Sequence, residues 1–263
     1  MKAIILAAGQ GTRLKKYTEN LPKGMLSFAG KTIIEWQIEM YRKCGIKDII
    51  IVRGFAGDKI QYEGVGYYTN EDYSNTNMVE SFMMAKSEFD DDIIVSYSDI
   101  LFEEQMLQGM INAKGDFVVA VDDCWKTYWE KRYNTIDFDT ESLVLDGEDN
   151  IVELGLESPP IEKIDARYIG LLKFSKTGLK HIVTILDEAY TYFEDKPWKQ
   201  SGKPIHKAYM TDLLQAIIDS KKPVKAKRFN NGWIEFDTNE DYENACNWVK
   251  DGSIREVINI PLT

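Results

Sequence analysis

Short apolar runs alternate with amphipathic segments along most of the chain. The first run, residues 3–8, is apolar at every position, which is typical of a strand buried on both faces. Residues 33–44 place isoleucines and a tyrosine at roughly helical spacing after Thr32, which predicts a capped helix. The repeated alternation of strand and helix indicates a mostly parallel sheet with helices on both faces.

The predicted strands cover residues 3–8, 48–52, 65–68, 93–97, 117–121, 168–172, the region near 224, and 233–236. The predicted helices cover residues 33–44, 77–87, 103–113, segments that start near 175 and 207, and 239–250. Residues 122–164 differ, because a hairpin-like pattern surrounds Asp146-Gly147, a dipeptide typical of tight turns. We therefore expect one domain over residues 1–263, in which approximately residues 122–164 form a small substrate-binding lobe on the sheet.

Composition limits the surroundings and partners of the protein. The 263 residues are 44% hydrophobic and 29% charged, which is enough apolar material for a packed core. Lysine and arginine total 32 against 43 acidic residues, a formal net charge of -11, so no nucleic-acid partner is expected. The three cysteines are far apart, which argues against a zinc site or a disulfide framework. The first apolar run ends at Gly9, too early for a signal peptide or a membrane span. We expect a cytoplasmic protein without a membrane partner.

A glycine-containing loop, Leu6-Ala-Ala-Gly-Gln-Gly-Thr-Arg-Leu14, directly follows the first predicted strand. Small residues let the backbone approach a ligand closely, and successive N–H groups in such a turn bind anions. Arg13 adds a forked donor that suits phosphate oxygens. The spacing differs from both the P-loop and the dinucleotide-binding fingerprint. On spacing alone, an ordinary tight turn between strand and helix is the alternative.

Together with Pro22-Lys23, this loop resembles the signature of the nucleotidyltransferases that make sugar and alditol nucleotides. The resemblance implies a Rossmann-like α/β fold of the GT-A type, a mostly parallel mixed sheet flanked by helices, with a small acceptor-binding lobe. In that family the loop wraps the triphosphate of the incoming nucleotide and the lysine helps to neutralise it. The resemblance therefore implies catalytic roles for Arg13 and Lys23. It implies nucleotide contacts for Leu6, Ala7, Ala8, Gly9, Gly11 and Thr12.

Three carboxylates lie at the ends of predicted strands. Asp99 follows the strand at residues 93–97, and the carboxyl ends of strands face the ligand crevice in open α/β sheets. Glu235 and Asp237 are two residues apart, so on a strand both point to the same face. Taken singly, Asp99 could cap a helix and the other two could lie on a solvated strand face. Converging carboxylates would instead bind Mg²⁺, and the resemblance implies this role for all three, against the α-phosphate of the nucleotide.

The resemblance covers nearly the whole chain and is strongest to the cytidylyltransferases that act on phosphocholine, phosphonates and related phosphates such as those of amino alcohols. Ser98-Asp99 stands where that family commonly has Gly-Asp, which leaves the role of the carboxylate unchanged. On the nucleotide side the resemblance points to Asn77, Ser81 and Ser98. On the acceptor side it points to Trp125, Tyr128, Arg132, Tyr168, Gly170, Tyr209, Asp212 and Trp233. Lys163 compares only loosely with the lysine that binds the acceptor phosphate in sugar-type relatives.

An aromatic stretch contains Trp125, Tyr128, Trp129 and Tyr133. These rings could help to form a cage for a quaternary ammonium group, as cation–π recognition of choline requires. The alternative is that an amphipathic helix packs them against the core, and for any single ring this alternative is favoured.

We therefore hypothesise a Mg²⁺-dependent cytidylyltransferase that transfers CMP from CTP to a small phosphorylated or phosphonate acceptor and releases pyrophosphate. The acceptor would resemble phosphocholine, aminoethylphosphonate or an amino-alcohol phosphate. One alternative is a sugar 1-phosphate nucleotidyltransferase that uses another nucleoside triphosphate, and a second is an inactive nucleotide-binding regulatory subunit. The presence of the loop, of Lys23 and of all three carboxylates argues against the inactive alternative. A homodimer is one of the oligomeric states that the sequence allows.

Overall fold

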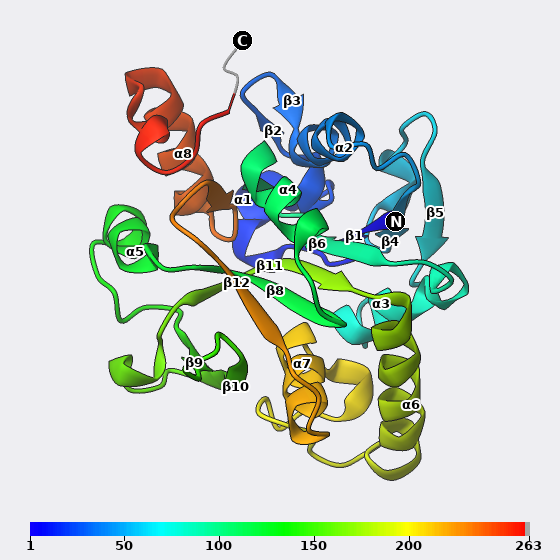
Figure 1. Cartoon of the computed structure of the whole chain (residues 1–263). Coiled ribbons are helices and arrows are strands. Elements are labelled where there is room, and N and C mark those ends of the chain that lie inside the picture. Colours follow the sequence, from blue (N-terminus) through cyan, green and yellow to red (C-terminus); the bar gives the residue numbers. More distant parts are fainter. Residues whose placement is uncertain (261–263) are drawn as a thin grey trace.

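The computed structural model describes residues 1–260, and a seven-stranded sheet forms its centre (Figure 1). In order across this sheet the strands are β12 (Lys225–Phe229), β8 (Phe117–Asp122), β11 (Arg167–Phe174), β6 (Ile93–Tyr97), β1 (Lys2–Ala7), β4 (Ile49–Arg53) and β5 (Gly66–Thr69). Strand β11 runs antiparallel to both of its neighbours, and every other pair in the sheet is parallel. The predicted mostly parallel mixed sheet is confirmed.

Strand β1 shows why the first run is apolar at every position. Ile4 and Leu6 belong to the core on one face of the sheet, whereas Ala3, Ile5 and Ala7 belong to the core on the other face. Successive side chains of a strand point to opposite faces, so a strand covered by helices on both sides must be apolar throughout.

Helices cover both faces of the sheet (Figure 1). The core on one face includes side chains from α2 (Ile33–Lys43), α4 (Glu104–Asn112), α5 (Trp125–Tyr133) and α8 (Asn239–Asp251). The core on the other face includes side chains from α3 (Met78–Met84), α6 (Lys176–Tyr192) and α7 (Met210–Asp219). Capping boxes fix the starts of two of them, between Thr32 and Glu35 in α2 and between Thr238 and Asp241 in α8.

A small second sheet pairs β7 (Ile100–Phe102) with β13 (Trp233–Glu235) in antiparallel register. The strand predicted at residues 233–236 therefore lies outside the central sheet. Glu235 lies opposite Ile100, and the backbone N–H of Phe236 donates a 2.9 Å hydrogen bond to the carbonyl of Asp99. Helix α4 begins only at Glu104, so Asp99 does not cap it. This pairing brings the turn after β6 next to the chain that follows β13.

Residues 122–164 hold α5 and a hairpin of β9 (Glu141–Leu145) and β10 (Ile151–Glu157), with the turn at the predicted Asp-Gly dipeptide. Asp146 closes the turn by accepting hydrogen bonds from the backbone N–H groups of Glu148 and Asn150. Strand β10 contacts α7, where the N–H of Leu154 donates a 3.0 Å hydrogen bond to Gln215 Oε1. The hairpin is thereby held against the helical layer on one side of the sheet.

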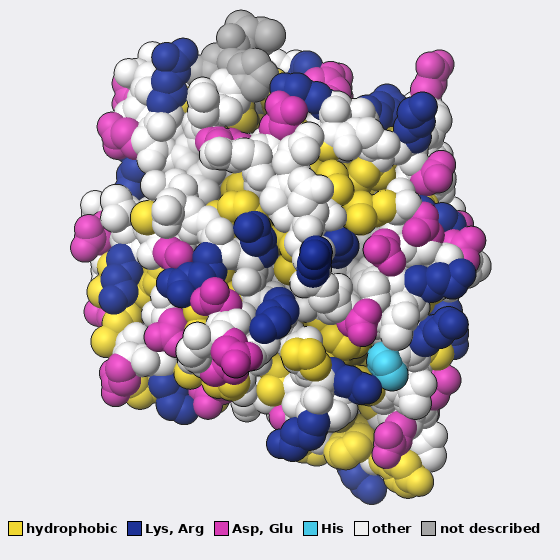
Figure 2. Space-filling view, in the orientation of Figure 1, with side chains coloured by type: hydrophobic (Ala, Val, Ile, Leu, Met, Phe, Trp, Pro, Cys, Tyr) yellow, Lys and Arg dark blue, Asp and Glu magenta, His cyan; other side chains and the backbone are white. Residues whose placement is uncertain are grey.

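The surface carries charges of both signs. On the face shown in Figure 2, lysine and arginine side chains are interspersed with aspartate and glutamate. Among residues 1–260, no helix is both long enough and apolar enough to cross a membrane.

Candidate active site

A cavity of about 730 Å³ opens at the carboxyl ends of β1 and β6. Its walls come from the glycine loop, the start of α3, residues 139–141, the start of β11 and the chain around β13. Most of the predicted site residues line this cavity: Leu6, Ala8, Gly9, Gly11, Thr12, Arg13, Lys23, Asn77, Ser81, Ser98, Asp99, Tyr168, Gly170, Tyr209, Glu235 and Asp237. The remaining predicted residues do not line it: Ala7, Trp125, Tyr128, Arg132, Asp212 and Trp233.

The glycine loop owes its shape to Gly11. This residue has a φ of 62°, in the left-handed region that favours glycine. A Cβ on Gly11 would lie 3.2 Å from the Cβ of Lys23, so the loop and the lysine segment approach closely only because a hydrogen stands there. Thr18 fixes the same turn, since its hydroxyl donates a 2.9 Å hydrogen bond to the carbonyl of Gly11. The loop and Lys23 are therefore one structural unit.

Lys23 lies between two of the predicted metal-binding carboxylates. Its Nζ is 2.6 Å from Asp99 Oδ2 and 2.6 Å from Asp237 Oδ1. Burial opposes the charge on Lys23, but Asp99 and Asp237 outweigh burial and raise the pKa of its ammonium group. The segment is tightly packed as well: a Cβ on Gly24 would lie 2.6 Å from Ile34 Cγ1. Lys23 is thus a permanently charged and firmly placed cation on the cavity wall.

The two carboxylates that contact Lys23 keep further oxygens for other partners. Asp99 Oδ1 is buried without a hydrogen-bond partner among residues 1–260. Asp237 Oδ2 forms a 2.6 Å ion pair with Arg13 Nη2 that lacks hydrogen-bond geometry. Burial raises the pKa of Asp237, and Glu235 and Asp99 add to this effect while Lys23 opposes it. A further cation would satisfy the unpartnered oxygen of Asp99 and would offset the effects that raise the pKa of Asp237.

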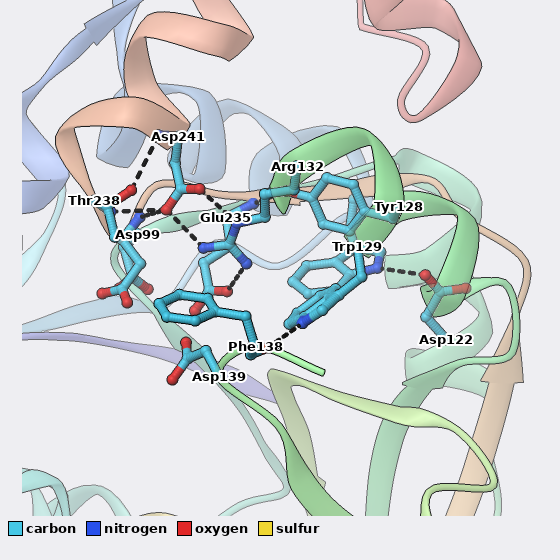
Figure 3. A network of polar contacts seen from close by, with 12 residues as sticks. Asp99, Asp122, Tyr128, Trp129, Arg132, Phe138, Asp139, Glu235, Thr238 and Asp241 are labelled. Carbon is cyan, nitrogen blue, oxygen red and sulfur yellow. Dashed lines mark hydrogen bonds and ion pairs between the residues drawn. The ribbon is translucent and has the colours of Figure 1, made fainter. Parts of the chain in front are cut away.

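Glu235, the third predicted carboxylate, is bound by Arg132 (Figure 3). Arg132 donates from Nη1 to Glu235 Oε2 at 2.7 Å, and from Nε and Nη2 to the two carboxylate oxygens of Asp241 at 2.6 and 2.7 Å. Burial raises the pKa of Glu235, but Arg132 outweighs it, with Arg167 and Lys23 adding to its effect, and this pKa falls to about 2. Within the described part of the chain, no three carboxylate, histidine or cysteine side chains are grouped so as to hold a metal ion. The expected set of three carboxylates is present around the cavity but is not gathered at one point.

The aromatic stretch corrects the prediction for the acceptor side. Trp125, Tyr128 and Trp233 are buried in the core, with 1%, 2% and 1% of their surface exposed, and cannot contact a ligand in the cavity. Trp233 Nε1 donates to buried Asp122 at 2.9 Å. The rings of α5 therefore pack against the core, as the alternative to the cage predicted.

The rings nevertheless surround a cation, which is the protein's own Arg132. Its guanidinium carbon lies 5.8 Å from the ring centre of Tyr128, 5.1 Å from that of Trp129 and 4.6 Å from that of Tyr133. Arg132 is 2% exposed, so its predicted contact with an acceptor is also wrong. It acts on the site through Glu235, as a positioning residue.

Asp212 and Ala7 are likewise structural in this fold. Asp212 accepts hydrogen bonds from the backbone N–H groups of Tyr209 and Ser201, which caps α7 and fixes the loop before it. Ala7 is buried in the core beneath the glycine loop. Lys163 does not line the cavity and forms a 3.0 Å ion pair with Glu153. The loose comparison of Lys163 with a phosphate-binding lysine therefore finds no support in the fold.

The other predicted residues form the cavity walls. Asn77 caps α3 by accepting a hydrogen bond from the N–H of Met78, and Ser81 is held in the next turn. On the opposite wall, the hydroxyl of Tyr168 donates to that of Tyr97 at 2.9 Å. Gly170, at a φ of 78°, leaves room for the Tyr97 ring, which would lie 2.6 Å from a Cβ at that position.

Several lining residues were not predicted from the sequence. They are Tyr73, Thr76, Met78, Tyr97, Asp139, Thr140, Glu141, Glu157, Ser158, Arg167, Ile169 and Thr211. Glu141 and Glu157 lie directly opposite each other in the β9–β10 hairpin. A charge on each strand of a predicted hairpin was a visible signal, but which charges face each other depends on the register.

Comparisons with known proteins identify the family of this chain. The model of the MobA-like NTP transferase domain matches residues 3–138. The chain is 35% identical to the CTP:phosphoglutamine cytidylyltransferase of Campylobacter jejuni over 254 residues, which cover 92% of this chain and 98% of that protein. It is 33% identical to the choline-phosphate cytidylyltransferase of Streptococcus pneumoniae over 171 residues, 62% of this chain and 73% of that protein.

The fold has solved counterparts as well. The structure of the CTP:phosphocholine cytidylyltransferase of Streptococcus pneumoniae superposes with a TM-score of 0.73 at 24% identity, covering 94% of this chain and 97% of that one. The chain is a nucleotidyltransferase and belongs to the MobA-like NTP transferase family.

Proposed function

We propose that this enzyme transfers CMP from CTP to a small phosphorylated or phosphonate acceptor that carries a positively charged nitrogen, and releases pyrophosphate. The observation that carries the proposal is the placement of Lys23 between Asp99 and Asp237, directly beneath the glycine loop. The preference for CTP is supported by the names of the two relatives reported above, both cytidylyltransferases.

The chemistry needs no base from the protein. An acceptor phosphate is already an anion near neutral pH, so one of its oxygens forms a bond to the α-phosphorus of CTP while the bond from that phosphorus to the pyrophosphate oxygen breaks. Lys23 and Arg13 supply positive charge where the triphosphate gathers negative charge, and the glycine loop offers backbone N–H donors. Catalysis then consists of positioning and charge neutralisation.

Mg²⁺ fits the residues present. Asp99 Oδ1 is buried and unpaired, and Asp237 Oδ2 has an ion pair but no hydrogen bond. Mg²⁺ in enzymes of phosphoryl chemistry commonly takes one or two carboxylates and completes its shell with water and substrate phosphates. We propose Asp99 and Asp237 as these ligands, whereas Glu235 is held by Arg132. When bound, the ion would neutralise charge on the α-phosphate.

An acidic wall of the cavity is the reason for proposing that the acceptor carries a positively charged nitrogen. Asp139, Glu141 and Glu157 line the cavity from the segment that precedes β9 and from the β9–β10 hairpin. Burial raises the pKa of Glu141, and the carboxylates of Asp139, Glu235 and Glu157 raise it further. Arg167 opposes this rise. A cationic group of the acceptor would relieve the repulsion among these carboxylates.

A pyrophosphate-release screen tests the proposal. It crosses the four nucleoside triphosphates with phosphocholine, phosphoethanolamine, aminoethylphosphonate, an amino-acid-derived phosphate and glucose 1-phosphate, in the presence of Mg²⁺. We expect release with CTP and an amine-bearing acceptor, and none with the Asp237→Asn protein. Preferential use of a hexose 1-phosphate would overturn the acceptor class, and preference for another nucleotide would overturn the cytidylyl assignment. Absence of release with every pair would favour a regulatory subunit.

A further inference from the structure

Arg167 differs from the other two cations that line the cavity. Arg13 forms an ion pair with Asp237, and Lys23 forms ion pairs with Asp99 and Asp237. Arg167 forms none with the residues that the structure describes, and its Nε and Nη1 atoms are buried without a hydrogen-bond partner. A buried guanidinium with unused donors is unfavourable unless a ligand completes it.

The guanidinium of Arg167 is fixed without using its N–H donors. Its central carbon lies 4.5 Å from the ring centre of Trp129, a stacking contact that leaves the in-plane donors free. Trp129 is itself immobile, because it has no exposed surface and its Nε1 donates a 2.7 Å hydrogen bond to the carbonyl of Phe138. The side chain is therefore preorganised for a partner with a matching set of acceptors.

Arg167 lines the same cavity as the proposed metal ligands and the acidic wall. Burial raises the pKa of Glu141 in β9, and the charge of Arg167 opposes this rise; in β13, Arg132 and Arg167 both act to lower the pKa of Glu235. Neither carboxylate comes within ion-pair distance of it. Arg167 starts β11, on the wall that also carries Tyr168 and lies across from the hairpin.

We propose that Arg167 binds the phosphate or phosphonate group of the acceptor and presents its oxygen to the α-phosphorus. A tetrahedral oxyanion offers the paired acceptors that a forked guanidinium matches best. Arg167 transfers no proton: the acceptor oxygen forms the new bond to phosphorus, and the electron pair of the broken bond leaves with pyrophosphate. Lys163, the cation that the sequence suggested for this task, is paired with Glu153 outside the cavity. This proposal rests on the proposed function, which supplies the acceptor.

Steady-state kinetics of Arg167→Met, Arg167→Lys and the matched control Lys163→Met test the assignment. Arg167→Met is expected to lower kcat/KM for the acceptor by roughly 10²-fold or more, the scale of losing one preorganised donor, while the KM for CTP stays near that of the wild type. Arg167→Lys restores part of the loss because it keeps the charge but not the fork. Lys163→Met behaves as wild type. An unchanged acceptor kcat/KM in Arg167→Met, or an equal loss of CTP affinity, would overturn the assignment.

A binding measurement separates this proposal from the proposed function. Calorimetry with phosphoethanolamine and with inorganic phosphate, on the whole chain without nucleotide, needs no turnover. The wild type is expected to bind at least one of these probes, and Arg167→Met to bind it at least tenfold more weakly. If no nucleotide supports turnover but this difference is present, the cytidylyl assignment fails and the anion site stands. Equal affinities in the two proteins, including equal absence of binding, would overturn the role of Arg167.

Discussion

Arg132 donates two parallel hydrogen bonds, of 2.6 and 2.7 Å, to the carboxylate of Asp241. This pair joins α5 to the first turn of α8, and the third donor of the same guanidinium reaches Glu235 at 2.7 Å. Asp241 also accepts hydrogen bonds from the backbone N–H groups of Asp237 and Thr238. The positions of Glu235 and of the chain that follows it thus depend on an arginine that does not line the cavity.

Replacement of Arg132 is expected to lower the free energy of unfolding. Arg132→Met leaves Asp241 and Glu235 without their ion-pair partner at a site where Asp241 is 3% exposed, so the free energy of unfolding should fall by about 3–5 kcal/mol. Urea denaturation measures this difference. Arg255→Met, which removes an exposed arginine from the surface, should change the free energy of unfolding by less than about 0.5 kcal/mol. Similar small effects of both substitutions would show that the buried network contributes little.

The cost of Arg132→Met should also depend on pH. In the wild type the pKa of Glu235 is lowered to about 2, so its ionised form contributes stability above its usual value of 4.5, and this contribution is lost as the pH falls toward 2. Without Arg132 the largest opposing influence is gone and burial raises this pKa, so ionisation destabilises the variant at neutral pH. We expect a larger difference in unfolding free energy at about pH 8 than at about pH 5. A difference that grows toward acid pH would contradict this sign.

The proposed metal ligands give a prediction about Mg²⁺. Asp99→Asn and Asp237→Asn should each reduce turnover by orders of magnitude, because a lost ligand removes charge that stabilises the transition state. The fold should persist, since Lys23 keeps one of its two carboxylate partners in each variant. Thermal denaturation with CTP, with and without Mg²⁺, provides a second readout in which only the wild type should be stabilised by the metal. Asp123→Asn, at a surface ion pair with Arg228, serves as the control. Normal turnover of Asp237→Asn at saturating Mg²⁺ would place the metal elsewhere.

Lys23 should matter far more than the lysines that follow the glycine loop. Lys23→Ala removes a buried cation fixed on the cavity wall and is expected to lower kcat/KM by roughly 10²-fold or more. Lys15→Ala and Lys16→Ala should have little effect, since Lys16 is 61% exposed and forms its ion pair with Glu243. Steady-state kinetics with CTP as the varied substrate measures the contrast. Equal losses for Lys16→Ala and Lys23→Ala would show that the triphosphate lies elsewhere on the loop.

Trp125 should act through stability and not through acceptor affinity. Its ring is 1% exposed and packs edge to face against Trp129, with ring centres 6.0 Å apart. Trp125→Ala is expected to lower the free energy of unfolding by about 3–5 kcal/mol. The KM for an amine-bearing acceptor should stay near the wild-type value at a temperature where the variant is folded. A raised KM with unchanged stability would restore the ring to the acceptor site.

Removing a charge from the acidic wall should weaken acceptor binding without lowering the stability of the protein. Glu157 and Glu141 are directly opposite each other across a hairpin, an arrangement that costs stability when both are charged. Glu157→Gln should therefore leave the stability unchanged or slightly higher while raising the KM for an amine-bearing acceptor. An acceptor that lacks the amine provides the control and should be unaffected. Equal changes for both acceptors would rule out recognition of the charged nitrogen by this pair.

Local patterns predicted the parts of the fold that local physics determines. The strand at β1, the cap at Thr32 and the glycine loop each depend on a few consecutive residues, so the sequence alone was sufficient. The sequence also assigned Asp99 and Asp237 to one site. Both contact Lys23 in the structure, through the pairing of β7 with β13 and not through the central sheet, whereas the predicted convergence of all three carboxylates at one point is not seen among the described residues.

The acceptor side depends on contacts that no local pattern contains. The rings of α5 suggested a cage for a ligand, yet Arg132 follows Tyr128 by four residues and Trp129 by three, the helical spacing that places its own charge beside them. That spacing was the available signal for a cation inside the protein. Arg167 and the two opposed glutamates gave no comparable signal. The pairing of Glu141 with Glu157 depends on the register of the hairpin, and Arg167 stands out only because its Nε and Nη1 atoms are buried without a hydrogen-bond partner among the described residues.

Lys23 and Asp237 are 214 positions apart in the sequence, which has a consequence for the order of events during synthesis. At elongation rates of roughly 5–20 residues per second, Asp237 would be synthesised roughly 10–40 s after Lys23. The glycine loop and its lysine therefore leave the ribosome long before the carboxylate that completes their surroundings. A nascent chain spends that interval with the glycine loop and Lys23 made but Asp237 absent, so this side of the cavity is completed only when the chain around β13 and α8 has been synthesised.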